Sequence, residues 1–210
     1  EDDEYLDFLG RGIAAPLSTF GPRTLPGFEG AEEAGLDGWT IKYCGLRIAF
    51  PLTGSHNLLD SLAAIAMARS LGCGPDEVKE GLESVKPIFG RSEIFRGPVT
   101  VIQDCYNANP DSVAKSLEFC DSLAWKGRRV YVLGSMKELG DTSEAEHRAL
   151  GRRAGTSRAD AILFYGPETA CAAEEARAAG FRGFLAHADD FDELARTAGS
   201  LVRDGDLWLL

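Results

Sequence analysis

The feature that most constrains this chain is a regular alternation of short apolar runs and amphipathic segments after Pro87. Connections of this length join parallel strands, because an antiparallel pair needs only a tight turn. The second part of the chain, residues 88–210, is therefore predicted to be an α/β fold: a doubly wound, mostly parallel, Rossmann-like sheet with helices on both faces. Strands are expected near 99–105, 129–134, 160–165, 182–186 and 206–210, and helices near 110–124, 143–155, 168–179 and 190–203.

The first part, residues 1–87, follows a different pattern. Apolar residues alternate with polar ones on both sides of Cys44-Gly45, which predicts a β-hairpin. An alanine-rich segment near 57–71 is apolar on most sides and predicts a buried helix, and a shorter helix is expected near 76–85. We therefore divide the chain into two domains, 1–87 and 88–210.

The composition excludes some classes of protein. A formal charge of -11 argues against a nucleic-acid partner, because such binding needs clustered Lys and Arg. The five cysteines are scattered, with no C-x-x-C pair, which favours reduced thiols over disulfides or zinc. No leader segment is evident, and no apolar run approaches the roughly 20 residues that cross a bilayer. A cytoplasmic protein without a membrane partner is expected.

The stretch QDCYNANPDS, residues 103–112, places polar groups where an expected strand meets an expected helix. Ligands of such sheets bind beyond the carboxyl ends of the strands. A helix N-terminus favours anions, yet Asp104 and Asp111 would repel a pyrophosphate. A carboxylate there suits hydroxyls, an amine or a metal. The alternative is structural: Asn109 caps the helix and Asp104 merely ends a strand.

The stretch LGSMKELGDTSEAEH, residues 133–147, is a second strand–loop–helix junction, with an apparent capping box at Ser143 and Glu146. A generic loop explains it equally well. His147, inside the expected helix, is interpreted as a partly exposed structural histidine.

The stretch TGSHNLLDSLAA, residues 53–64, brings His56 and Asn57 to a helix start, where a ring and an amide suit a purine base. Ser55 or Asn57 could instead simply cap that helix. In FGRSE, Arg91 lies at the domain boundary and could reach a phosphate or be a surface residue. Neither G-x-x-x-x-G-K-[ST] nor G-x-G-x-x-G occurs, so this sequence contains no phosphate-binding loop and is not expected to complete a reaction alone.

Taken together and in order, SHNLLDSLAA, GRSE, DCYNANPDS and LGSMKELGDTSEAEH closely resemble the Mur ligase family of peptidoglycan synthesis. The YNANP and MKELG forms look like those of the members that add D-alanyl-D-alanine to UDP-N-acetylmuramoyl-tripeptide. The resemblance implies an ATP- and magnesium-dependent amide ligase that works through an acyl phosphate; we also expect a monomer. It further implies that 1–87 is the last part of the central ATP-binding domain, that 88–210 is the C-terminal ligase domain, and that the P-loop and metal ligands precede this sequence.

The resemblance also implies roles for individual residues. Arg91 would be catalytic, His56 and Asn57 would meet the adenine, and Asp104 would bind the ribose hydroxyls. The other implied contacts are Tyr106 and Asn107 with the nucleotide, and Asn109, Ser135, Met136 and Leu139 with the dipeptide; no metal ligand is implied. Two positions depart from the family pattern: Asp60 replaces a usual Asn, and Ser135 replaces a usual Asp.

Two other functions stay open. A sister ligase such as a folylpolyglutamate synthase uses similar domains, although the YNANP form argues against it. A free-standing doubly wound module that binds a small ligand without catalysis is the alternative of a different class.

Overall fold

The computed structural model describes residue 8, residues 10–15 and residues 17–210, and it forms two compact units that divide between Lys86 and Pro87. The sequence placed this division one residue later. The remaining residues of the first expected domain, 1–7, 9 and 16, lie outside the described part of the chain.

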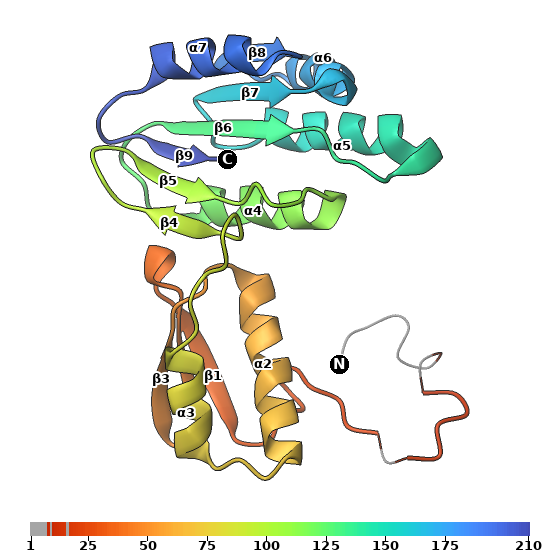
Figure 1. The fold of residues 1–210 in the computed structure, drawn as a ribbon, viewed down its shortest axis with the longest axis vertical. Helices are drawn as coiled ribbons and strands as arrows, with labels where there is room; N and C mark the ends of the chain where they lie inside the picture. Colours follow the sequence, from red (N-terminus) through yellow and green to blue (C-terminus); the bar gives the residue numbers. More distant parts are fainter. Residues whose placement is uncertain (1–7, 9, 16) are drawn as a thin grey trace. The chain divides into compact units, whose positions relative to one another are not determined.

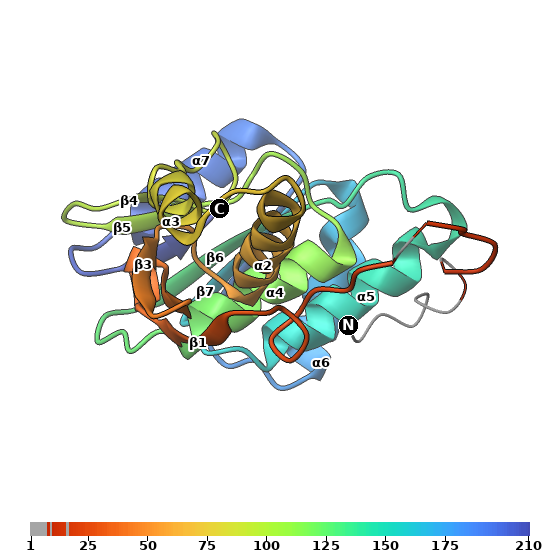
Figure 2. The same cartoon turned by 90° about the horizontal axis from the view of Figure 1, so that it is seen from below.

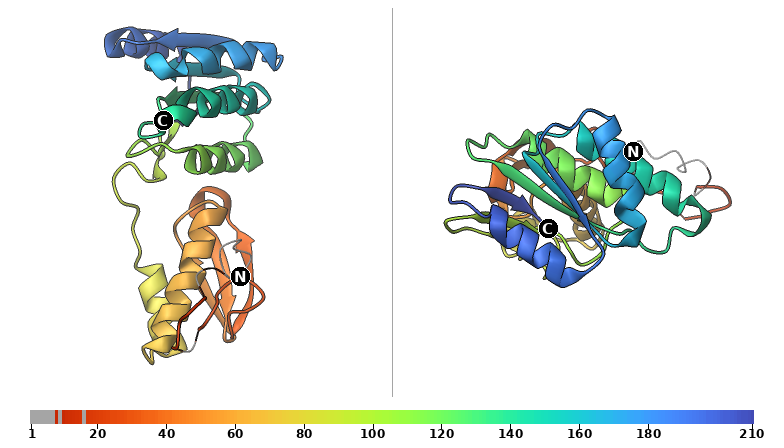
Figure 3. Two further views of the ribbon diagram at one scale, coloured as in Figure 1. Left: turned by 90° about the vertical axis from the view of Figure 1, so that its right-hand side faces the viewer. Right: turned by 90° about the horizontal axis from the view of Figure 1, so that it is seen from above.

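The first unit is an antiparallel sheet with two helices (Figure 1; Figure 3, left). The expected hairpin is present, with Ile41 opposite Ile48, and an additional strand that sequence patterning missed pairs with its first arm. The elements are β1 (Phe28–Glu33), η1 (Gly35–Asp37), β2 (Trp39–Tyr43), β3 (Leu46–Phe50), α2 (Ser55–Ser70) and α3 (Pro75–Glu83).

The core of this unit lies between one face of the sheet and the two helices. Inward residues of β2 and β3, including Ile41 and Ile48, are fully buried against Leu62 of α2 and other apolar side chains. The prediction that α2 is buried was wrong for its other side, because only one face of the helix meets the sheet within this unit. Leu59 and Met67 on α2 are 46% and 63% exposed.

The second unit is a six-stranded sheet in the order β4-β5-β9-β6-β7-β8. The neighbouring strands β5, β9, β6, β7 and β8 all pair in parallel, which confirms the mostly parallel α/β class. The edge strand β4 pairs antiparallel with β5 and was not predicted. The strands are β4 (Glu93–Phe95), β5 (Thr100–Gln103), β6 (Arg129–Gly134), β7 (Ala161–Tyr165), β8 (Phe184–Ala188) and β9 (Leu207–Leu209).

Helices cover both faces of this sheet, as expected. Figure 2 and the right panel of Figure 3 show α4, α5 and α6 on one face and α7 on the other. The helical elements are α4 (Pro110–Ser122), η2 (Gly140–Thr142), α5 (Ser143–Gly155), η3 (Pro167–Thr169), α6 (Ala170–Ala178) and α7 (Phe191–Leu201). Among the described residues, no helix combines the length and apolar character needed to cross a membrane.

Two helix starts show how the local sequence acts. At α4 the Asn109 side chain accepts a hydrogen bond from the Ser112 N–H (2.9 Å), and Ser112 Oγ accepts one from the Asn109 N–H (3.2 Å), so the capping interpretation of Asn109 is confirmed. At α5 the capping box was wrong. The helix continues directly from the turn η2, its N-cap is Thr142, and no side chain caps it.

Candidate functional site

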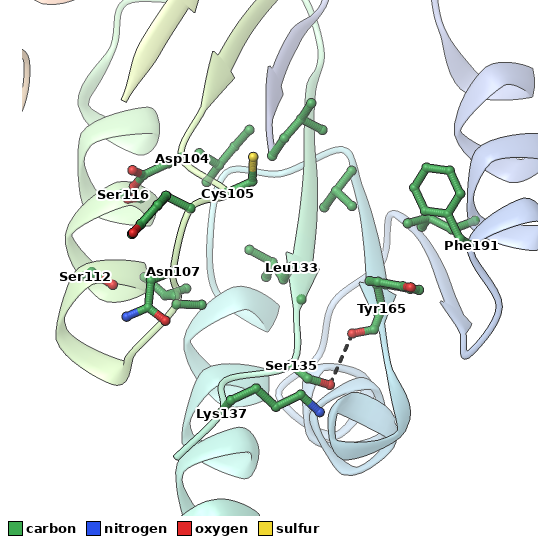
Figure 4. A pocket seen from close by; sticks show the side chains of 18 residues that line it. Asp104, Cys105, Asn107, Ser112, Ser116, Leu133, Ser135, Lys137, Tyr165 and Phe191 are labelled. Carbon is green, nitrogen blue, oxygen red and sulfur yellow. Dashed lines mark hydrogen bonds between the residues drawn. The ribbon is translucent and has the colours of Figure 1, made fainter. Parts of the chain in front are cut away.

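The second unit contains a cavity of about 510 Å³ at the carboxyl ends of its parallel strands. Its lining comes from the loop after β5, the start of α4, the end of β6 with its loop, and the ends of β7, β9 and α7 (Figure 4). This is the edge where ligands of open α/β sheets bind. Of the residues predicted for the site, Asp104, Tyr106, Asn107 and Ser135 line it.

Asp104 stands at the inner wall, with both carboxylate oxygens already hydrogen-bonded. Oδ1 accepts from the Ser92 backbone N–H (3.0 Å), and Oδ2 accepts a short bond from the Ser116 hydroxyl of α4. The carboxylate is therefore fixed in position and does more than end a strand. Because two carboxylate oxygens offer about four acceptor positions, it can still receive hydroxyl donors from a ligand.

Arg91 and Tyr106 form a second contact between the segment before β4 and the loop after β5; the first is the bond from the Ser92 N–H to Asp104. The Arg91 guanidinium lies 4.5 Å from the centre of the Tyr106 ring, and the Tyr106 N–H donates to the Gly90 carbonyl (3.0 Å). Gly90 has a φ of +69°, and a Cβ there would approach the Tyr106 nitrogen to 3.0 Å, so glycine is needed at this close approach. Arg91 itself is not part of the cavity lining.

The two asparagines of the loop have different environments. The exposed Asn107 side chain faces the cavity and has no hydrogen-bond partner within the described part of the chain. Asn109 lies outside the cavity lining, and its side chain is engaged at the cap of α4. The geometry therefore leaves the amide of Asn107 available to a ligand and gives that of Asn109 a structural role.

In the loop after β6, some of the predicted residues line the cavity and others do not. Ser135 lines the cavity and donates to the Tyr165 carbonyl (3.3 Å; Figure 4). Met136 is only 2% exposed, and neither it nor Leu139 lines the cavity. The side chains of these two residues, predicted to contact the dipeptide, thus lie apart from the hollow.

His147 binds the backbone of the loop at Met136. The histidine is fully buried, which corrects the expectation of partial exposure. Its Nε2 accepts from the Met136 backbone N–H (3.0 Å), and its Nδ1 donates to the Ser143 carbonyl (2.7 Å). Both ring nitrogens are satisfied by one tautomer, so His147 fastens the loop to α5 rather than reaching a ligand.

Lys137, which sequence analysis did not single out, projects from this loop into the lining. Its side chain is 63% exposed, and its ammonium donates to Glu168 of η3 (2.5 Å). The Lys137 ammonium, followed by the Ser135 hydroxyl, holds the pKa of Glu168 at about 2. The pair is therefore charged across the ordinary range of pH.

His56 and Asn57 belong to the first unit, at the start of α2. Neither Ser55 nor Asn57 caps the helix; the N-cap is Gly54, and a Cβ there would approach the His56 ring to 2.7 Å. Asn57 Nδ2 donates to the Thr53 carbonyl (2.7 Å) and lies 3.1 Å from His56 Nε2. At this helix mouth, two buried polar atoms, Thr53 Oγ1 and His56 Nδ1, have no partner in the described structure. Unpaired buried polar atoms are costly, so this helix mouth is suited to a polar ligand.

A metal site does not emerge from these residues. In the described ranges, no group of three or more His, Cys, Asp or Glu side chains is placed to hold an ion. The described residues therefore form no ready-made set of protein ligands for a magnesium ion.

Sequence reasoning also missed the aromatic and helical parts of the lining. Ser112 and Ser116 are four residues apart and so share one face of α4, a spacing that could have revealed them. Tyr165 and Phe191 form an edge-to-face pair, with ring centres 6.3 Å apart, at the side of the cavity near α7. Nothing in the local sequence indicated that β7 and α7 would bring them together.

Comparison with known protein families shows which family this chain belongs to. Residues 90–210 match the model of the Mur ligase, glutamate ligase domain. The chain belongs to the Mur ligase family. The match includes Arg91, the Asp104 loop and the loop after β6, whereas His56 and Asn57 precede it.

Relatives of this Mur ligase chain are longer than it is. The UDP-N-acetylmuramoyl-tripeptide–D-alanyl-D-alanine ligase of Treponema pallidum (strain Nichols) is 37% identical over 178 residues, which are 85% of this chain and 39% of that protein. A crystal structure of MurF from Acinetobacter baumannii superposes with a TM-score of 0.72 at 26% identity, covering 87% of this chain and 40% of that one.

A third relative was solved with a nucleotide. MurF ligase from Thermotoga maritima in complex with ADP superposes with a TM-score of 0.66 at 24% identity, over 87% of this chain and 41% of that chain. At this identity the likeness shows the fold alone.

Proposed function

We propose that this chain is part of an ATP-dependent ligase that adds D-alanyl-D-alanine to UDP-N-acetylmuramoyl-tripeptide. The observation that carries the proposal is the relative with this printed activity, which aligns with 85% of the chain at 37% identity. Such an extent includes residues of both units. The cavity at the carboxyl edge of the sheet, which is lined by residues of the DCYNANPDS and LGSMKELG motifs, supports it independently of the name.

The adenine of ATP is assigned to the start of α2. Thr53 Oγ1 and His56 Nδ1 are buried without partners, and a heteroaromatic base with donors and acceptors on its edge would satisfy such atoms. The Asn57 oxygen stays available, because the two contacts described for this amide use its nitrogen. His56 and Asn57 thus keep the role that the resemblance implies.

The ribose and the phosphates are assigned to the second unit. Asp104, held by Ser92 and Ser116, presents a fixed carboxylate to the cavity, which suits the two hydroxyls of a ribose better than a phosphate. Arg91 is exposed and rests on the Tyr106 ring, so its guanidinium can leave that surface for a phosphate at little cost. Tyr106 and Asn107 complete this side of the site.

The reaction in this proposal joins a carboxylate to an amine. An oxygen of the tripeptide carboxylate forms a bond to the γ-phosphorus of ATP and ADP leaves; the dipeptide amine then attacks the acyl carbon, phosphate leaves, and the amine loses its proton. Catalysis of phosphoryl transfer consists mainly of positioning and charge neutralisation. The described residues form no group of three or more magnesium ligands, so the ligands of the ion are assigned to another part of the enzyme.

The remaining parts of the proposal are a cytoplasmic location and a monomeric state, which suit a ligase acting on a nucleotide-linked precursor. The folylpolyglutamate synthase alternative is disfavoured, because the relative that aligns with most of the chain carries the peptidoglycan activity in its name. The binding-module alternative is disfavoured by the same relative, because the aligned part of this ligase includes residues of both units.

Phosphate release by the natural protein in which this sequence occurs tests the proposal. We expect release only when ATP, UDP-N-acetylmuramoyl-tripeptide and D-alanyl-D-alanine are all present. Asp104→Ala should raise KM for ATP clearly more than KM for the dipeptide, with Asp111→Ala, an exposed carboxylate in the first turn of α4, as the matched control. No release with the complete set of substrates contradicts the function, and an unchanged KM for ATP in Asp104→Ala contradicts the ribose assignment.

A further inference from the structure

Lys137 is the one cationic side chain among the described residues that line the cavity. The only anionic side chain of that lining, Asp104, belongs to the loop after β5. Figure 4 shows Lys137 on the side of Ser135 and Tyr165, away from Asp104 and Ser116. The cavity therefore has a positive and a negative group at separate places on its wall.

The wall between these two groups is largely apolar. Val132, Leu133 and Leu209 come from the ends of the central strands, and Tyr165, Phe191 and Leu194 form the side next to α7. Phe191 is 64% exposed, so its ring is accessible to a ligand in the cavity. This surface suits small apolar substituents such as methyl groups.

The contact with Glu168 positions Lys137 and leaves donors of its ammonium group available. An ammonium carries three N–H donors, and the described bond to Glu168 employs one of them. Because the pKa of Glu168 is about 2, this anchor stays charged at neutral pH. The other donors belong to a side chain that is 63% exposed and are free to meet a carboxylate.

We propose that Lys137 binds the free carboxylate of the incoming D-alanyl-D-alanine and so determines which way round the dipeptide lies in the cavity. This inference rests on the proposed function and names the residue that sets its specificity for the dipeptide. The two methyl groups lie against the apolar wall. The amine end points toward the loop with Asn107 and Asp104, the side to which the nucleotide is assigned. A dipeptide without a free carboxylate lacks the group that Lys137 recognises.

The test compares two acceptor substrates in the phosphate-release assay of the natural protein: D-alanyl-D-alanine and D-alanyl-D-alaninamide, whose carboxylate is replaced by a neutral amide. A hydrogen bond to a charged group changes affinity by about tenfold or more. The wild-type protein should show a KM for the amide about tenfold above that for the acid, again on the scale of a charged hydrogen bond.

Substitution of the lysine should remove this preference. In Lys137→Met, KM for the free acid is expected to rise about tenfold to meet that of the amide, while KM for the amide and KM for ATP stay unchanged. Lys137→Arg should keep most of the preference, because it retains a cation. Lys126→Met is the matched control: Lys126 is exposed and precedes β6, at the opposite end of that strand.

Each outcome has a distinct meaning. Equal KM values for acid and amide in the wild-type protein, or an undiminished preference in Lys137→Met, overturn the role of Lys137 while the ligase function stands. A rise in KM for ATP alone assigns Lys137 to the nucleotide and also overturns it. Absence of phosphate release from the wild-type protein with either dipeptide contradicts the proposed function itself.

Discussion

The two ends of the parallel sheet treat their charged residues differently. At the amino-terminal end, Asp206 is 2% exposed and accepts hydrogen bonds from Arg128 Nε (3.0 Å) and Nη2 (2.6 Å) and from the Arg203 N–H (3.0 Å). Beside it, the buried Arg129 guanidinium donates to the Cys120 and Leu123 carbonyls at the end of α4. At the carboxyl end, Lys137 and Asn107 are exposed to the cavity.

This difference separates residues that stabilise the fold from residues available to a ligand. At the amino-terminal end, Asp206 and the two arginines are bound to groups of the protein itself. At the carboxyl end, groups such as Asp104 are held in place but keep some hydrogen-bonding capacity. The following substitutions test how sharp this division is.

The largest effect is expected at the amino-terminal end. Asp206→Ala leaves Arg128 without its partner, and breaking a buried ion pair costs about 3 to 5 kcal/mol. Urea unfolding followed by tryptophan fluorescence, to which the buried Trp208 of the same unit contributes, measures this loss. The control is Glu118→Ala, which removes an exposed pair with Lys115 and should cost no more than about 1 kcal/mol. Equal urea midpoints for Asp206→Ala and Glu118→Ala would show that the buried ion pair stabilises the fold no more than the exposed one does.

A smaller effect is expected at the cap of α4. Asn109→Ala should lower the free energy of unfolding by about 1 kcal/mol, whereas Asn109→Ser, which preserves a capping oxygen, should stay near the wild-type value. If Asn109 serves only the helix, Asn109→Ser also leaves KM for the dipeptide unchanged. A raised KM for the dipeptide in the stable Asn109→Ser variant would show that Asn109 contributes to ligand binding.

The smallest effect is a dependence on pH at the carboxyl end. The pKa of Glu168 is lowered from 4.5 to about 2 in the folded protein, chiefly by Lys137. The carboxylate therefore stabilises the fold above pH 4.5, and this contribution is lost as the pH falls toward 2. Because the pair is partly exposed, the effect on the free energy of unfolding is small.

The contribution of Glu168 to the free energy of unfolding is measured from the midpoints of urea unfolding at pH 6 and pH 3. Glu168→Gln should weaken the decline between these two values, relative to the same substitution at Glu174, which is more exposed and lies 3.8 Å from Arg148. An identical decline in both variants would show that the bond between Lys137 and Glu168 does not form in solution.

Much of the fold could be predicted from the sequence, because strands and helices of the second unit carry strong local patterns. The expected strand near 182–186 begins instead at Phe184, whose N–H bonds to the Asp160 carbonyl, since pairing with β7 rather than local propensity sets its start. The strand β4 has three residues and little pattern of its own, and it forms because its residues pair with β5.

The site was less predictable than the fold. Motifs identified the loops that carry Asp104 and Ser135, but the fate of each side chain depends on partners far along the chain. The Met136 N–H donates to His147, and the Lys137 ammonium donates to Glu168. Neither contact leaves a mark in a local stretch of sequence.

The position of β9 in the sheet has a consequence for biosynthesis. This strand lies between β5 and β6, with Thr100 opposite Leu207, so the centre of the sheet pairs residues that are 107 positions apart (207 − 100). At a translation rate of about 5 to 20 residues per second, β5 waits several seconds for its partner. During that interval two apolar strand edges have no neighbour in the nascent protein. Such edges can pair with other chains, and shielding by a chaperone or by the ribosome surface would reduce this pairing.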